Sequence, residues 1–154
     1  MRSYFIYITF IFSILIIGCA CKRGLVPVKN ACPQLRCEMR YATEDNFTGQ
    51  KLYEDPECLL LASTAGKLVK VQNELQARGL GLKVFDAYRT LDAQKKMWAL
   101  LPDRHFVEDP DKGPDHCRGA AVDVTLVMPD GTELDMGTRF DEFSEKSRPD
   151  FFGL

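Results

Sequence analysis

The stretch that decides the fold and chemistry of this chain is residues 113–128, which read GPDHCRGAAVDVTLVM. A loop with a glycine and a proline leads to His116, and a run of small residues then leads into an apolar segment. Residues 120–128 carry the strongest strand pattern of the chain. Asp123 stands inside that strand, where a carboxylate between apolar neighbours needs a partner, because an uncompensated buried charge is costly.

His116 and Asp123 together suggest a metal site. An imidazole nitrogen and a carboxylate oxygen can supply two of the three protein ligands of an open zinc site. The small residues between them would let the loop fold back onto the strand. The alternatives are that Asp123 is satisfied by an arginine or a backbone group and that His116 is unrelated to it. The spacing alone leaves these interpretations open.

Arg89 is the next candidate, because it directly follows an expected strand at residues 82–88. A guanidinium at a strand end could stabilise an oxyanion or bind a carboxylate. The alternative is an ordinary surface arginine.

The remaining periodicity predicts an α+β domain. Apolar residues recur three and four apart over residues 58–78, which predicts a helix that stops at a glycine, and residues 91–100 read as a second helix. Residues 102–115 contain three prolines and a glycine and are expected to be a loop. Short strands are expected at residues 37–41 and 132–134. Strands and helices alternate without a regular βαβ rhythm, which favours the α+β class.

Composition excludes several classes of function. The 154 residues carry a net charge of −2 and are 45% hydrophobic, which fits one small globular domain. We expect no nucleic-acid partner, because no basic excess is present. The chain has two histidines, His105 and His116, so a site with several histidine ligands is nearly excluded. His105 is a weak candidate for a further ligand and is expected to be solvated.

The N-terminal segment is typical of an export signal. Residues 1–18 combine an early arginine with a short apolar run, and the sequence IIGC at 16–19 resembles a lipoprotein box. We expect export to the periplasm or cell envelope, lipidation at Cys19, and membrane contact only through that anchor. An ordinary cleaved signal is the alternative. Residues 19–36 are expected to be a tether.

The other cysteines suggest a disulfide. Exported proteins retain disulfides, and lipidation of Cys19 would leave an odd number of the six cysteines. The spacing of Cys32 and Cys37 lacks the second pair that a zinc ribbon requires. A disulfide among Cys32, Cys37 and Cys58 is therefore expected, with its connectivity open.

Four segments occur in the order and at the separations of one known family. They are YATEDNFTG at 41–49, DAYR at 86–89, GPDHCRGAAVDVTL at 113–126 and MGTRFD at 136–141. Through them residues 37–154 closely resemble the zinc D-alanyl-D-alanine dipeptidases of the vancomycin-resistance type. That family is similar to the D,D-carboxypeptidases and the hedgehog signalling domain. The resemblance implies a small hedgehog/D,D-peptidase-like zinc domain of the α+β class.

The resemblance also implies roles for individual residues. In the family signature Ser-x-His-x-x-Gly-x-Ala-x-Asp, His116 and Asp123 match the ligands of one zinc ion, and Arg89 matches the arginine that stabilises the transition state. The substrate implied is D-Ala-D-Ala, or a related D-amino-acid peptide, in cell-wall peptidoglycan metabolism. A D,D-carboxypeptidase is an alternative. Pro114 replaces the serine of the signature, and Thr90 replaces a proline that usually follows the arginine.

One family motif has no match in the sequence. The family carries Glu-x-x-His, whose glutamate is the general base and whose histidine is the third zinc ligand, and no glutamate here precedes a histidine by three residues. Residues 37–154 are therefore expected to be a domain incomplete at its C-terminus. The alternative to an enzyme is an inactive truncated remnant or a weak metal- or peptide-binding lipoprotein.

Overall fold

Two small sheets organise the computed structural model, which describes residues 24–148 and 151–152. In the first, β1 (Leu25–Pro27) pairs antiparallel with β3 (Leu59–Leu61). The second has the order β2–β4–β5, with β2 parallel to β4 and β5 antiparallel to it. Its strands are β2 (Arg36–Cys37), β4 (Gly81–Asp86) and β5 (Asp123–Val127).

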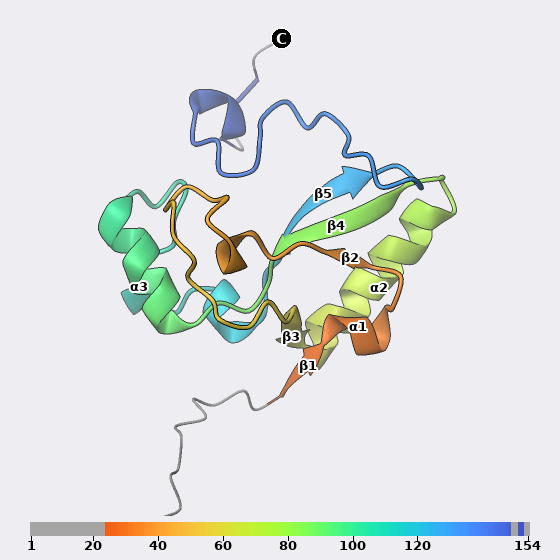
Figure 1. The fold of residues 1–154 in the computed structure, drawn as a ribbon, viewed down its shortest axis with the longest axis horizontal. Helices are drawn as coiled ribbons and strands as arrows, with labels where there is room; N and C mark the ends of the chain where they lie inside the picture. The colour runs from red at the N-terminus through yellow and green to blue at the C-terminus, as the bar shows by residue number, and fades with distance from the viewer. Residues whose placement is uncertain (1–23, 149–150, 153–154) are drawn as a thin grey trace, which may run out of the picture.

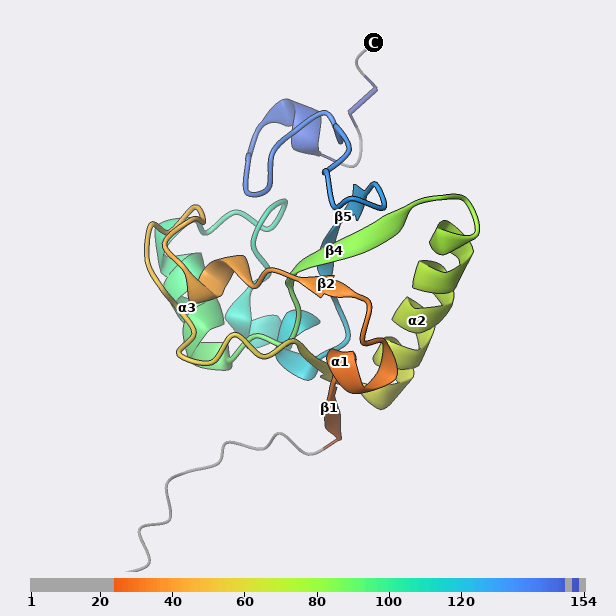
Figure 2. The same cartoon turned by 45° about the vertical axis from the view of Figure 1, so that its right-hand side comes forward.

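The helices flank this second sheet. They are α1 (Val28–Ala31), α2 (Ala62–Gln76) and α3 (Leu91–Leu100). Figures 1 and 2 show α2 and α3 on opposite sides of the molecule, with β4 and β5 between them. Single 3₁₀ turns complete the described elements: η1 (Arg40–Ala42), η2 (Pro110–Lys112), η3 (His116–Arg118) and η4 (Glu145–Ser147). The predicted α+β class is confirmed.

Helix α2 begins later than its pattern predicts. Residues 59–61 pair with β1 as a strand, so the helix starts at Ala62 and not at residue 58. Its buried face consists of Ala65, Leu68 and Gln72. Gly79 ends the helical segment with φ +75°, a left-handed conformation suited to glycine, and Leu80 N–H donates to Leu75 O at 2.9 Å.

Helix α3 has the bounds that the sequence predicts. Thr90 is its N-cap, and the Thr90 hydroxyl accepts a hydrogen bond from Ala93 N at 3.2 Å. The helix buries Ala93, Gln94 and Met97.

The described part of the expected tether is folded, which corrects that prediction. Val28, Cys32 and Leu35 are buried, and Val28 N–H donates to Cys58 O at 2.9 Å. The polar residues and prolines suggested a linker, but this segment supplies apolar side chains to the core. The predicted signal segment 1–18 and Cys19 lie outside the described residues.

The strands near the site are shorter than predicted. Residues 123–127 form β5, and Val127 bridges to Glu133 where a returning strand was expected. The expected strand at 37–41 is divided between β2 and η1, and the strand expected at 82–88 is β4, over 81–86.

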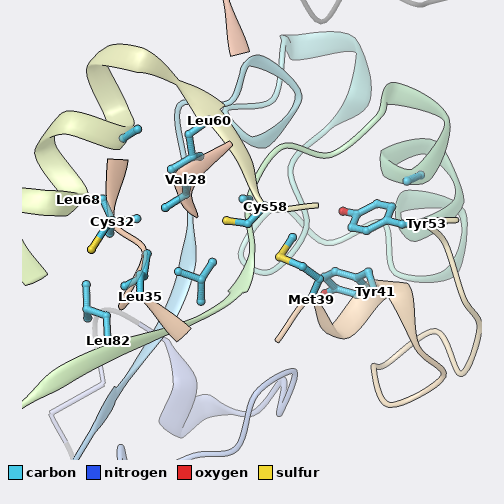
Figure 3. Close-up of a cluster of buried hydrophobic side chains, with 14 of the residues drawn as sticks. Val28, Cys32, Leu35, Met39, Tyr41, Tyr53, Cys58, Leu60, Leu68 and Leu82 are labelled. Atoms are coloured by element: carbon cyan, nitrogen blue, oxygen red, sulfur yellow. The ribbon is translucent and has the colours of Figure 1, made fainter. Parts of the chain in front are cut away.

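One hydrophobic cluster joins these elements (Figure 3). In the close-up, Leu68 and Leu82 lie at one end of the cluster and Tyr41 and Tyr53 at the other. The aromatic end lies near the site described below. In the part of the chain that the structure describes, no helix is long and apolar enough to cross a membrane.

Candidate active site

The site forms where strands β4 and β5 meet at an irregularity in their pairing. Val84 pairs with Val124, but Asp86 and not Phe85 pairs with Asp123. The register shift places two carboxylate residues opposite each other at the end of the ladder. Irregularities of this kind can redirect a side chain next to an active site.

His116 is positioned by both its backbone and its ring. Its carbonyl oxygen accepts a hydrogen bond from Arg89 N at 3.1 Å, which ties η3 to the end of β4. Its Nδ1 lies 2.8 Å from Ala87 O. A carbonyl oxygen can only accept, so Nδ1 carries the proton and donates it. In the neutral ring the lone pair is then on Nε2, which lies 3.4 Å from Asp123 Oδ1. In the protonated ring Nε2 carries a proton that it can donate to that oxygen.

Gly119 allows the loop after His116 to pack closely. It has φ +66°, and a Cβ at this position would lie 2.5 Å from Leu25 Cδ2 and 3.1 Å from Leu61 N. Its carbonyl accepts a hydrogen bond from Leu61 N at 3.0 Å. The glycine therefore lets the loop sit directly against the β1–β3 sheet.

His116 and Asp123 each stabilise the charged form of the other. Burial raises the pKa of Asp123, but the hydrogen bond with His116 and the charges of His116 and Arg89 outweigh it, so the net pKa is lowered. Burial lowers the pKa of His116, but the hydrogen bond and charge of Asp123 raise it above its usual value. Asp123 is therefore an ionised carboxylate directed at an imidazole nitrogen.

Arg89 is a buried cation held from two sides. Its Nε and Nη2 donate to Asp86 Oδ2 at 3.0 and 2.7 Å, and its Nη1 donates to Gln94 Oε1 at 2.7 Å. Nη2 also lies 3.7 Å from Asp123 Oδ2. Burial lowers the pKa of Arg89, but the charges of Asp86, Tyr53, Tyr41 and Asp123 together raise it above its usual value, so the guanidinium stays protonated.

Asp86 anchors this arrangement. Its Oδ1 accepts a hydrogen bond from Tyr53 OH at 2.9 Å, and its Oδ2 accepts the two from Arg89. Burial raises the pKa of Asp86, while the charges of Arg89 and His116 oppose that rise. The net pKa of Asp86 stays raised, and the hydrogen bonds from Tyr53 and Arg89 are the contacts that stabilise its ionised form.

An open cleft of about 1550 Å³ gives access to the site. Arg89, His116 and Asp123 line it together with Tyr41 and Asp141. The Tyr41 ring lies 5.2 Å from the Arg89 guanidinium carbon, and Tyr41 OH donates to Asp141 Oδ1 at 2.8 Å. The cleft thus brings together the three residues selected from the sequence.

Two of the acidic residues near His116 differ in their capacity to bind a metal. One candidate atom from each of Asp86, His116 and Asp123 lies within 4.8 Å of the others. Both oxygens of Asp86 already accept hydrogen bonds, and His116 turns its protonated Nδ1 toward Asp86, at 3.5 Å from Oδ2. His116 Nε2 and Asp123 Oδ1 are therefore the atoms suited to a shared cation.

His105 does not join this group. Its side chain is 61% exposed, and Nδ1 lies 2.9 Å from Asp103 Oδ1 on its own loop. It is solvated, as the sequence analysis expects.

Asp86, Tyr53 and Gln94, the residues that support Arg89, are not predicted from the sequence. Asp86 and Tyr53 are 33 positions apart, and their contact arises only from the fold. The sequence does contain a signal for Gln94, because this polar residue lies on the same face of the predicted helix as Ala93 and Met97. In the structure Gln94 is completely buried.

Comparison with known proteins gives a consistent result. Residues 21–153 match the sequence family Peptidase M15, described as D-Ala-D-Ala dipeptidase. The D-alanyl-D-alanine dipeptidase of Escherichia coli (strain K12) is 41% identical over 123 residues, which cover 80% of this chain and 64% of that protein. Those of Enterococcus faecium and Enterococcus faecalis (strain ATCC 700802 / V583) are 32% and 31% identical over 134 residues.

These matches cover only part of each relative. Each of the two enterococcal alignments spans 73% of this chain and 66% of the relative. The chain thus spans slightly less than two thirds of the length of these proteins.

Proposed function

This chain belongs to the Peptidase M15 family, the D-Ala-D-Ala dipeptidases, and on that premise we propose that it is a zinc metallopeptidase acting on D-Ala-D-Ala in peptidoglycan metabolism. The proposed zinc ligands are His116 and Asp123, and the proposed catalytic arginine is Arg89. One observation carries the proposal: His116 Nε2 faces Asp123 Oδ1 at 3.4 Å while Nδ1 is engaged with Ala87 O.

The separation of these two atoms fits a shared zinc ion. Two ligand atoms that each lie about 2.1 Å from zinc, at a tetrahedral angle, are about 3.4 Å apart. The hydrogen bond from Nδ1 to a backbone carbonyl is the contact that fixes the ring orientation of many zinc-binding histidines. The lowered pKa of Asp123 keeps its carboxylate in the ionised form that zinc requires.

Arg89 is suited to bind the negative charge that develops on the scissile carbonyl oxygen. Bound zinc would polarise that carbonyl and activate a water molecule. The hydrogen bonds to Asp86 and Gln94 use three of the five N–H groups of Arg89 within the described part of the chain. The remaining two belong to Nη1 and Nη2, the second of which lies on the Asp123 side. A fixed donor beside the substrate needs no reorganisation during reaction.

The substrate proposal rests on the relatives. All three are named D-alanyl-D-alanine dipeptidases, and the family match over residues 21–153 includes the segment with His116 and Asp123. The cleft places a cation and a metal-binding pair on one surface, which suits a small peptide with a carbonyl to be polarised.

Zinc titration of the purified chain tests the metal site directly. A competing chromophoric chelator should report one zinc ion per chain. His116→Ala and Asp123→Ala should each weaken zinc by more than about 100-fold, above the 10–100-fold typical of residues that only support a ligand. His105→Ala is the matched control and should bind zinc as the parent chain does. Equal affinity in the His116→Ala and His105→Ala variants would contradict the proposal.

We also propose that the chain is exported and lipidated at Cys19, with residues 1–18 as its signal. The sequence IIGC at 16–19 supports this. Metabolic labelling with a fatty acid should mark the parent chain and Cys21→Ala but not Cys19→Ala. Labelling of the Cys19→Ala variant at the parental level would contradict the proposal.

A further inference from the structure

Glu108 is hydrogen-bonded to both halves of the candidate active site. Its backbone carbonyl oxygen accepts a hydrogen bond from Gln94 Nε2 at 2.5 Å, and Gln94 Oε1 accepts one from Arg89 Nη1 at 2.7 Å. Its carboxylate oxygen Oε2 accepts a hydrogen bond from Asp115 N at 3.0 Å, and Asp115 directly precedes His116. One residue therefore contacts the support of the arginine and the support of the histidine.

These contacts close into a ring. Opposite Glu108, the backbone N–H of Arg89 donates to His116 O at 3.1 Å. The ring runs from the Arg89 side chain through Gln94, Glu108 and Asp115 to His116, and the backbone bond completes it. Because groups in a connected hydrogen-bond network orient one another, the loss of one bond should loosen the others. The arginine and the histidine are therefore positioned together.

The backbone of Glu108 is anchored on both sides. Val107, which precedes it, is 2% exposed and belongs to the hydrophobic cluster, and Val107 N donates to Asp103 O at 2.8 Å. Asp109, which follows it, is the N-cap of η2, and its Oδ1 accepts a hydrogen bond from Asp111 N at 3.0 Å. Glu108 thus presents its two acceptors from a fixed segment.

Asp115 transmits this constraint to η3. It is the residue before the turn, and its carbonyl oxygen accepts hydrogen bonds from Arg118 N at 3.1 Å and Ala120 N at 3.0 Å. A carboxylate that holds the Asp115 amide therefore fixes the start of the turn that carries His116.

Hydrogen bonds, and not a disulfide, hold this turn. Cys117, which lies within η3, is a free thiol. Cys32, Cys37 and Cys58 are also free thiols, so the disulfide that the sequence predicts among them is not formed in the described part of the chain. The position of η3 thus depends on the contacts of its own residues and of Asp115.

We propose that Glu108 is a positioning residue of the candidate active site, which fixes Arg89 through its carbonyl oxygen and His116 through its carboxylate. The roles of Arg89 and His116 are those of the proposed function, on which this inference rests. The Glu108 side chain is exposed, so its bond to Asp115 adds little to the free energy of unfolding, because water can satisfy both groups. Water does not fix the direction of the Asp115 amide, however, and a metal ligand must be held in one orientation.

Zinc affinity of the full chain, purified in detergent, separates this role from a structural one. Glu108→Ala should weaken zinc by about 10-fold, as expected for a residue that supports a ligand, and should change the melting temperature by less than about 2 °C. Glu108→Gln keeps an acceptor oxygen and should bind zinc within about threefold of the parent chain. Glu74→Ala, on the exposed face of α2, is the matched control and should bind zinc as the parent chain does.

Two results of the zinc titration would overturn the proposal. Equal zinc affinity in Glu108→Ala and Glu74→Ala would show that the carboxylate does not position the ligand. An equal loss in Glu108→Gln and Glu108→Ala would show that the negative charge acts and not the hydrogen bond. A parent chain that binds no zinc would contradict the proposed function instead, and the metal-free measurement below then decides the positioning role.

Amide hydrogen exchange, followed by NMR in the metal-free chain, tests the coupling across the ring. Glu108→Ala should speed exchange at Asp115 N and also at Arg89 N, on the opposite side of the ring, by about 10-fold, while the amides of α2 exchange as in the parent chain. Unchanged exchange at Arg89 N would overturn the proposal. Equal acceleration in α2 would show that Glu108 supports the whole fold, and it would overturn the proposal as well.

Discussion

At the residue scale, the site depends on buried polar side chains whose hydrogen-bonding atoms already have partners within the protein. Asp86 is completely buried, and its two carboxylate oxygens accept hydrogen bonds from Arg89 and Tyr53. Gln94 extends the network, because it accepts from Arg89 Nη1 and its Nε2 donates to Glu108 O at 2.5 Å. Arg89 is therefore fixed before any ligand arrives, and each supporting group should matter for stability as well as for function.

Tyr53→Phe tests this dependence. The change removes the donor to Asp86 Oδ1 and leaves a buried carboxylate oxygen unsatisfied, so we expect a loss of about 1–3 kcal/mol in the free energy of unfolding. Tyr41→Phe is the control, because its partner Asp141 is only half-buried and water can replace the hydroxyl. Urea denaturation measures both variants. A Tyr53→Phe variant no less stable than Tyr41→Phe would show that Asp86 does not need this donor.

Gly119→Ala tests the close approach of the histidine loop to the β1–β3 sheet. The left-handed conformation costs alanine about 1–2 kcal/mol, and the crowding against Leu25 and Leu61 adds to this, so we expect a total loss of about 2–4 kcal/mol. Gly79→Ala isolates the first contribution, since it has φ +75° with no atom within 4 Å of the added Cβ. Equal losses in the two variants would mean that the loop moves away at little cost.

At the element scale, the sequence predicts best where local signals decide the structure. Helix α3 has its predicted bounds because Thr90 caps it and its buried face repeats at helical spacing. The predicted start of α2 at residue 58 is wrong, because Leu59–Leu61 pair with β1 as a strand. No local sequence pattern indicates that pairing. The prediction of a tether at residues 19–36 is wrong for its described part for the same reason. Residues 25–35 fold against a hydrophobic core that distant segments supply.

The cap of α3 also gives a physical role to one departure from the family pattern. Thr90, which replaces the usual proline after Arg89, accepts a hydrogen bond from Ala93 N. Thr90→Ala should therefore lower the free energy of unfolding by about 1 kcal/mol, whereas Thr90→Ser should change it by a few tenths at most. Thermal unfolding of the two variants makes the comparison, and equal losses would show that the hydroxyl does not cap the helix.

At the scale of the whole molecule, His116, Asp123 and Arg89 could be selected from motif order, and the fold brings them to one cleft. The support from Tyr53 could not be predicted, because it reaches the site from a segment that the motifs do not connect to Asp86. The two proposed ligands come from η3 and β5, so a shared zinc ion would link a loop to the central sheet. Zinc binding should therefore also stabilise the fold.

Peptide hydrolysis by a polypeptide of these 154 residues should be slow. A catalytic zinc site requires three protein ligands and an open position, and the described residues bring two suitable groups, His116 and Asp123, to one point. The sequence also has no Glu-x-x-His to supply the base that the family resemblance implies. A missing general base costs about 10²–10⁴-fold in rate, so release of D-Ala from D-Ala-D-Ala should fall at least about 100-fold below that of the Escherichia coli relative assayed alongside. Turnover that matches the relative and is lost in His116→Ala would show instead that other residues of this chain supply the base and the third ligand.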